Sequence, residues 1–176
     1  MLYENGHFCL FVLSHKLPKL ITVRQKTAIR FLGRGKKAMA AKAPVKYNIL
    51  LVDDYAPVRR ALRKIIEANP DFQVIGEVNN GRELLRSLKI VPANLVVLDI
   101  TMPGMTGFEA ARRLKQDYPE VKVLVLTIHA YREYADRALS LGAEGYLLKE
   151  EADEELVLAI TCLKQGRTYI SSRISA

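Results

Sequence analysis

Short apolar runs recur along the chain from residue 47 onward, and segments with helical spacing separate them. Three runs, at 49–52, 95–98 and 123–126, are continuously apolar rather than alternating, as expected for strands that are covered on both faces. This pattern predicts a parallel sheet wrapped by helices. The predicted strands are Asn48–Val52, Phe72–Val78, Leu95–Leu98, Val121–Leu126 and Gly145–Leu148.

Apolar residues at helical spacing fill the segments between the strands. The first helix has Pro57 at a first helical position, and its apolar positions are Val58, Ala61, Leu62, Ile65 and Ile66. The last carries a stripe of Leu156, Ala159, Ile160 and Leu163, and Gly166 supplies a stop after it. Weaker patterns predict helices at about 82–89, 106–117 and 131–141. Five strands alternating with five helices indicate a doubly wound α/β fold, a (βα)5 three-layer sandwich.

Polar residues stand where the apolar strands end. Asp53 and Asp54 follow the first strand, Asp99 the third, Thr127 the fourth and Lys149 the fifth. The carboxyl ends of parallel strands form the ligand crevice of such sheets, so these side chains should meet at one edge. Taken singly, the two adjacent acids could cap a helix or be solvated, and the threonine could be an ordinary capping hydroxyl. Their convergence favours a shared site.

The residue types at this edge suit phosphoryl chemistry. Crowded carboxylates repel one another and call for a cation, and oxygen ligands without nearby His or Cys favour Mg²⁺. An ionised aspartate is a competent nucleophile toward phosphorus, and Asp99 is the best candidate because it closes a fully apolar strand. A metal on one side and the Lys149 ammonium on the other would cover the phosphoryl oxygens, with Thr127 donating a hydrogen bond.

Ordered motifs from about Asn48 to Gly166 resemble the receiver domain of two-component response regulators, the CheY-like fold. The matching segments are ILLVDD at 49–54, VLDITMPGMTG at 97–107, LT at 126–127 and GAEGYLLK at 142–149. The GYLLK segment and the ending GRTYIS at 166–171 resemble the NarL/FixJ-type subfamily of the LuxR family. The resemblance implies a flavodoxin-like sheet of order 2-1-3-4-5.

The resemblance also implies a role for each site residue. Asp99 would accept a phosphoryl group from a sensor histidine kinase. Mg²⁺ would be held by Asp54, Asp99 and the backbone carbonyl of Thr101, with Asp53 assisting through water. The attached phosphoryl group would contact Thr127 and Lys149. The chain would thus be a phosphoacceptor and not an enzyme, although it could catalyse its own phosphorylation and dephosphorylation.

Two further residues have expected roles beside simpler alternatives. Tyr146 matches the family's switching aromatic, whose inward rotamer accompanies a shift of Thr127 toward the phosphate; the alternative is a half-buried strand tyrosine with a wet hydroxyl. His129 should border the mouth of the site and tune dephosphorylation by filling the path of the attacking water; the alternative is an exposed loop histidine.

The expected partners follow from the subfamily. Its receiver usually precedes a helix-turn-helix domain, so we expect DNA binding and control of transcription only through a C-terminal domain absent from this sequence. Residues 167–176 would begin the linker to it. A cytoplasmic location, a sensor kinase partner and no membrane partner are expected, and the resemblance leaves a homodimer open. Lys149 precedes Glu150 rather than the proline common elsewhere in the family, a departure that this subfamily tolerates.

The charge distribution separates an N-terminal extension from the predicted domain. The net charge is +8, but residues 1–46 carry +9 and residues 47–176 carry −1. A basic DNA-reading surface therefore cannot be claimed for the domain. We expect residues 1–46 to be a mobile or artefactual extension, with residues 1–38 upstream of a natural start at Met39; binding to nucleic acid or acidic lipid is the alternative. Cys9 and Cys162 predict neither a disulfide framework nor a metal cluster, and Cys162 should be buried.

Three other classes of protein fit less well. A haloacid-dehalogenase-type phosphatase also uses Asp, Thr, Lys and Mg²⁺, but it places an Asp-x-Asp nucleophile motif after its first strand. A nucleotide-binding doubly wound domain would need a glycine-rich phosphate motif after a strand, and none is present. A pseudo-receiver usually lacks one of the acids, the threonine or the lysine, and all five positions are filled here.

Overall fold

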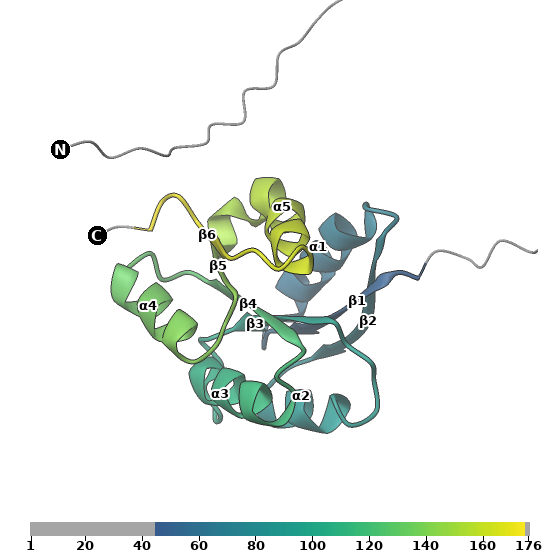
Figure 1. Cartoon of the computed structure of the whole chain (residues 1–176), viewed down its shortest axis with the longest axis horizontal. Helices are drawn as coiled ribbons and strands as arrows, with labels where there is room; N and C mark the ends of the chain where they lie inside the picture. The colour runs from purple at the N-terminus through teal and green to yellow at the C-terminus, as the bar shows by residue number, and fades with distance from the viewer. Residues whose placement is uncertain (1–44, 175–176) are drawn as a thin grey trace, which may run out of the picture. The chain divides into compact units, whose positions relative to one another are not determined.

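Residues 45–174 are described by a computed structural model, in which a six-stranded parallel sheet carries helices on both faces (Figure 1). The strands are β1 (Tyr47–Val52), β2 (Phe72–Val78), β3 (Leu95–Asp99), β4 (Lys122–Thr127), β5 (Gly145–Leu148) and β6 (Tyr169–Ile170). Their order is β2-β1-β3-β4-β5-β6. The doubly wound fold is confirmed, and the predictions for Cys9 and residues 1–38 lie outside the described residues.

The three helices predicted from weaker patterns begin and end within about two residues of their predicted boundaries. The helices are α1 (Ala56–Glu67), α2 (Gly81–Ser87), α3 (Gly107–Asp117), α4 (Arg132–Ser140) and α5 (Ala152–Lys164), with a short 3₁₀ helix, η1 (Lys149–Glu151), before α5. Side chains cap two of them: Asn80 accepts a hydrogen bond from the backbone of Glu83, and Thr106 accepts one from the backbone of Glu109. These bonds satisfy backbone donors that a helix start leaves free.

Two apolar layers hold the helices on the sheet. The helices α1 and α5 pack on one face, and α2, α3 and α4 pack on the other, an arrangement visible in Figure 1. The central strands β1, β3 and β4 supply residues to both layers, which explains why their sequences are continuously apolar. Cys162 is buried in the α1–α5 layer, as predicted.

The register of the central strands aligns their carboxyl ends. Val52 pairs with Leu98, so the next residues, Asp53 and Asp99, leave β1 and β3 at the same level. Asp99 in turn pairs with Leu126, which precedes Thr127. Thr127 pairs with Leu148, and Lys149 follows. Asp53, Asp99, Thr127 and Lys149 therefore lie side by side at the carboxyl ends of the adjacent strands β1, β3, β4 and β5.

One glycine lets a helix approach this edge closely. A Cβ atom at Gly107, the first residue of α3, would lie 2.2 Å from the carbonyl oxygen of Asp99 and 2.4 Å from the Cα of Ile100. Both atoms belong to the backbone, so no side-chain rotation could relieve the clash. The absence of a side chain at Gly107 thus allows α3 to start directly against the end of β3.

The structure adds one strand to the five that the sequence predicts. After α5, Gly166 adopts a positive φ of 75°, and Tyr169 and Ile170 then pair with β5 in parallel. A strand of two residues is too short to show the alternation of apolar and polar positions by which strands are predicted. This strand lies within residues 167–176, and the start of a linker in that segment stays a prediction. Among the described residues, every helix is too short or too polar to cross a membrane.

Candidate functional site

Two buried aspartates and one lysine form the centre of the predicted site. Asp53 and Asp99 are only 2% and 3% exposed. The Lys149 Nζ donates a hydrogen bond to Asp99 Oδ2 at 2.7 Å and lies 2.7 Å from Asp53 Oδ2. The ammonium therefore bridges two carboxylates that come from different strands.

The backbone holds the other oxygen of each buried carboxylate. Asp53 Oδ1 accepts a hydrogen bond from the Tyr55 amide at 2.8 Å, and Asp99 Oδ1 accepts one from the Thr101 amide at 2.9 Å. In each case the donor lies two residues beyond the aspartate, the Asx-turn arrangement. Both side chains are thus fixed in orientation before any ligand binds.

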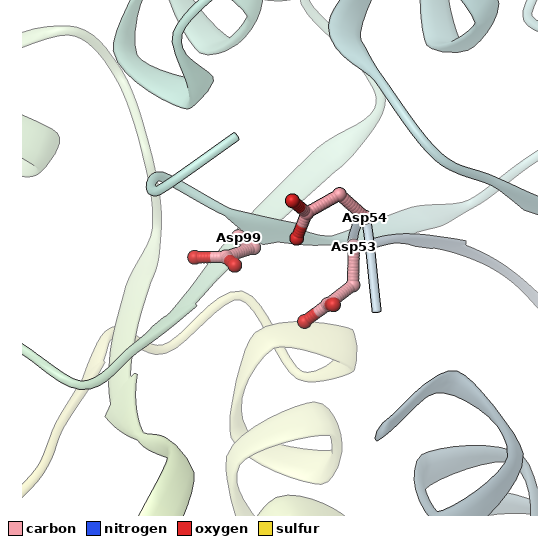
Figure 2. A group of neighbouring side chains, drawn as sticks. All are labelled: Asp53, Asp54 and Asp99. Carbon is pink, nitrogen blue, oxygen red and sulfur yellow. The ribbon is translucent and has the colours of Figure 1, made fainter. Parts of the chain in front are cut away.

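Asp54 completes an acidic cluster on the solvent side. Ligand oxygens of Asp53, Asp54 and Asp99 all lie within 4.8 Å of one another, and Asp54 is exposed whereas the other two are buried. Figure 2 shows the three carboxyl groups facing a common space at the ends of β1 and β3. The cluster is therefore open to solvent on the side of Asp54.

The charges and the oxygen atoms of this cluster suit a divalent cation. Three carboxylates against one ammonium leave an excess of two negative charges. Asp53 Oδ2 is buried and lies 2.7 Å from the Lys149 ammonium. An oxygen-only ligand set with an excess of negative charge fits a hard ion such as Mg²⁺. Thr101 adjoins the cluster, and a role for its carbonyl stays a prediction.

Lys149 is held in its charged form by the same contacts. Burial alone would lower the pKa of Lys149, but its contacts with Asp53 and Asp99 outweigh this effect, and the pKa is raised. A raised lysine pKa means that the ammonium persists throughout the physiological pH range. A permanent positive charge thus faces Asp99.

Thr127, His129 and Tyr146 form a second group beside the acidic cluster. The Thr127 side chain is fully buried, and its Oγ1 accepts a hydrogen bond from the His129 amide at 3.2 Å. The Tyr146 hydroxyl donates to the His129 carbonyl at 2.8 Å. Burial raises the pKa of Tyr146 to about 12, and the nearby Thr127 hydroxyl opposes part of that rise. Tyr146 is fully buried, so the half-buried alternative with a wet hydroxyl is wrong.

The His129 ring is also held in place. It stacks on the Tyr134 ring with 4.5 Å between centroids and an interplanar angle of 10°, and its Nε2 lies 3.3 Å from Thr101 Oγ1. The residue is half-buried and lies in the loop between β4 and α4, and its role in dephosphorylation stays a prediction. Tyr134 lies in α4, so the ring links the edge of the site to that helix.

A cleft of about 600 Å³ adjoins the acidic cluster, and apart from Asp54 its lining residues were not among the predicted site residues. Asp54, Asn79, Arg82 and Pro103 are among the residues that line it. Asn79 directly follows β2, whose carboxyl end lies at the same edge of the sheet. The end of the second predicted strand was the signal that could have identified this part of the site.

Comparison with known proteins gives consistent matches over the described domain. Residues 49–161 match the response regulator receiver domain. The sequence is 35% identical over 130 residues to the transcriptional regulatory protein DegU of Brevibacillus brevis, and 35% identical over 128 residues to the response regulator UvrY of Escherichia coli K12. These alignments cover 74% and 73% of the chain but only 55% and 59% of the relatives. The chain thus matches little more than half of their length.

Solved structures agree with the sequence matches. A LuxR-family two-component response regulator from Aurantimonas sp. SI85-9A1 is 35% identical and superimposes with a TM-score of 0.71, over 73% of this chain and 92% of that one. The non-phosphorylated receiver domain of the stress response regulator RcsB from Escherichia coli is 26% identical, with a TM-score of 0.69 over 72% of this chain and 99% of that one. Both similarities cover nearly three quarters of this chain.

The bridging role of Lys149 predicts a specific stability effect. In metal-free buffer, Lys149→Met should lower the free energy of unfolding by about 2 kcal/mol, because two buried carboxylates lose the ammonium that bridges them. Urea denaturation at neutral pH would measure the change. The double variant Lys149→Met/Asp99→Asn should recover part of the loss, since one of the two buried charges is then gone. Equal losses in the single and double variants would contradict this electrostatic account.

Proposed function

The chain belongs to the response regulator receiver domain family, and from this membership we propose that it accepts a phosphoryl group on Asp99 from the phosphohistidine of a sensor kinase. The observation that carries the proposal is the set of contacts around Asp99, whose two oxygens are held by the Thr101 amide and the Lys149 ammonium. Receiver domains of this type are generally not classical enzymes.

The proposed step is an in-line transfer between two nucleophiles. A carboxylate oxygen of Asp99 attacks the phosphorus, an O–P bond forms, and the P–N bond to the kinase imidazole breaks with its electron pair returning to the ring nitrogen. The Lys149 ammonium, now 2.7 Å from Asp99 Oδ2, would pair with the phosphoryl oxygens. The Thr127 hydroxyl would donate a hydrogen bond to the attached group.

A divalent metal has a defined place in this proposal. Asp54, Asp99 and the Thr101 carbonyl would hold Mg²⁺ directly and Asp53 would assist through water, consistent with the clustering of the three carboxylates. When bound, Mg²⁺ would supply charge neutralisation for the incoming phosphoryl group. The open cleft beside Asp54 leaves a route for the ion and its waters.

We further propose that the response passes through Thr127, His129 and Tyr146. His129 receives a hydrogen bond from Tyr146 at its carbonyl and donates one to Thr127 from its amide. A movement of Thr127 toward the phosphoryl group would therefore act on His129 and, through the stacked ring, on Tyr134 of α4. Phosphorylation would shift the population between two arrangements of this surface.

The partners proposed here are those of a longer protein in which the receiver is one domain. RcsB is described as forming dimers bound to DNA, and this supports a homodimer and control of transcription for the present chain. We propose that DNA is reached only through a helix-turn-helix domain that follows residues 167–176. The extension over residues 1–46 is proposed to precede the receiver without contributing to it. The cytoplasm is the proposed location.

Phosphorylation of Asp99 is the central prediction. Incubation with phosphoramidate and Mg²⁺ should add the mass of one phosphoryl group, because Asp99 is the acceptor, and intact-protein mass spectrometry would measure the gain. Asp99→Asn should show no gain, whereas the exposed-site control Asp117→Asn should behave as the wild type. Sustained turnover of phosphate esters, with no retained phosphoryl group, would instead favour the phosphatase alternative.

The proposed metal site predicts that replacing an aspartate of the cluster weakens Mg²⁺ binding, whereas replacing a distant aspartate does not. Asp54→Asn should weaken Mg²⁺ binding by at least about tenfold, because a charged oxygen ligand is lost. Isothermal titration calorimetry on chelator-treated protein would measure the affinity. Asp71→Asn removes an exposed acid just before the start of β2, at the end of the sheet opposite the acidic cluster. It should leave the Mg²⁺ affinity unchanged. Equal affinities for the two variants would argue against metal binding at this cluster.

His129 predicts an effect on the lifetime of the phosphorylated state. His129→Ala should shorten that lifetime several-fold, because the ring packed between Thr101 and Tyr134 would no longer fill the path of the attacking water. Loss of the phosphoryl mass over time after removal of the donor gives the lifetime. Tyr131→Ala, an exposed aromatic in the same loop, is the matched control. An unchanged lifetime in His129→Ala would remove this role.

A further inference from the structure

One buried polar side chain lies outside the groups described so far. Among residues 45–174, four polar or charged side chains are buried: Asp53, Asp99, Thr127 and Ser171. The first three belong to the proposed phosphorylation site. Ser171 comes after α5, directly beyond the short strand β6, and is only 2% exposed. A buried hydroxyl is stable only when it is hydrogen-bonded, so its partners indicate its role.

The amide and the side-chain oxygen of Ser171 are both hydrogen-bonded to β5. Its amide donates to the Tyr146 carbonyl at 2.9 Å, and its Oγ accepts from the Leu148 amide at 2.9 Å. Leu148 is the residue immediately before Lys149. The hydroxyl of Ser171 therefore continues the sheet hydrogen bonding by one more step, up to the residue at which β5 ends and Lys149 begins η1.

Alternate residues of the same segment secure it on either side of Ser171. The Tyr169 hydroxyl donates to a carboxylate oxygen of Glu155 in α5. The Arg173 guanidinium lies 3.1 Å from Glu150 Oε1 and 3.9 Å from Glu151 Oε1, both in η1. The segment 169–173 is thus attached to β5, η1 and α5 at once.

We propose that Ser171 is a positioning residue that holds the β5–η1 junction so that the Lys149 ammonium reaches Asp99. The inference rests on the proposed function, because Lys149 is taken to stabilise the transferring phosphoryl group. Without the Ser171 hydroxyl, the Leu148 amide loses its partner at the point from which the lysine side chain departs. Small displacements of a charged group at a reacting centre have large effects on rate.

The test compares phosphorylation rates of the full chain with phosphoramidate at saturating Mg²⁺. Ser171→Ala should lower the rate constant roughly tenfold, as loss of a supporting hydrogen bond commonly does, and should leave Mg²⁺ affinity unchanged because the three aspartates are intact. Ser172→Ala, at the exposed neighbour, should match the wild type. Ser171→Cys keeps the size of the side chain with a weaker acceptor and should give an intermediate rate; it replaces Ser171→Ala if that variant does not fold.

A double-variant cycle separates positioning from general stabilisation. In a Lys149→Ala background, the Ser171 substitution should cause no further loss of rate, because its effect passes through the lysine. An additive loss of rate in the double variant would overturn the inference, and so would a wild-type rate for both Ser171→Ala and Ser171→Cys. The proposed function would still stand in either case, provided that the wild-type chain is phosphorylated. A wild-type chain that gains no phosphoryl mass would instead overturn the proposed function, and this inference with it.

Discussion

The ion pair of Lys149 with Asp53 and Asp99 is the contact on which the arrangement of the site depends. Parallel strands in register bring like charges to one edge, where burial makes repulsion costly. One ammonium 2.7 Å from both buried carboxylates relieves part of that repulsion. It leaves an excess of negative charge beside the exposed Asp54. The charge that Lys149 leaves uncompensated thus favours the binding of a divalent cation at this edge.

The sequence was informative where burial imposes a simple pattern. The continuous apolar runs of β1, β3 and β4 follow from their contribution to both core layers, and the polar residue after each run falls at the sheet edge by topology alone. Asp53, Asp99 and Lys149 could therefore be predicted to meet before any coordinates were known. Their order along the sheet came from a family resemblance, because spacing in the sequence does not fix which strands are neighbours.

The remaining features depend on contacts between segments far apart in the sequence. Tyr169 and Ile170 form a strand only because β5 offers an unpaired edge, and two residues carry no periodic signal. The burial of Tyr146 requires the His129 carbonyl as a hydrogen-bond acceptor 17 positions away. The His129 ring contacts Thr101, which lies 28 positions away in the sequence. The preference of a short segment for helix or strand does not predict these contacts.

The strand β5 is fixed by backbone pairing with β4 and with β6, and two hydrogen bonds to Ser171 extend the pairing on the β6 side. The contact of β5 with the loop that follows Thr127 is different, because it is made by one side-chain hydrogen bond, from the Tyr146 hydroxyl to the His129 carbonyl. A single side-chain bond exchanges partners more readily than a paired backbone does. Movement that starts at Thr127 should therefore travel along the loop toward α4, while β5 stays fixed as the support for Lys149.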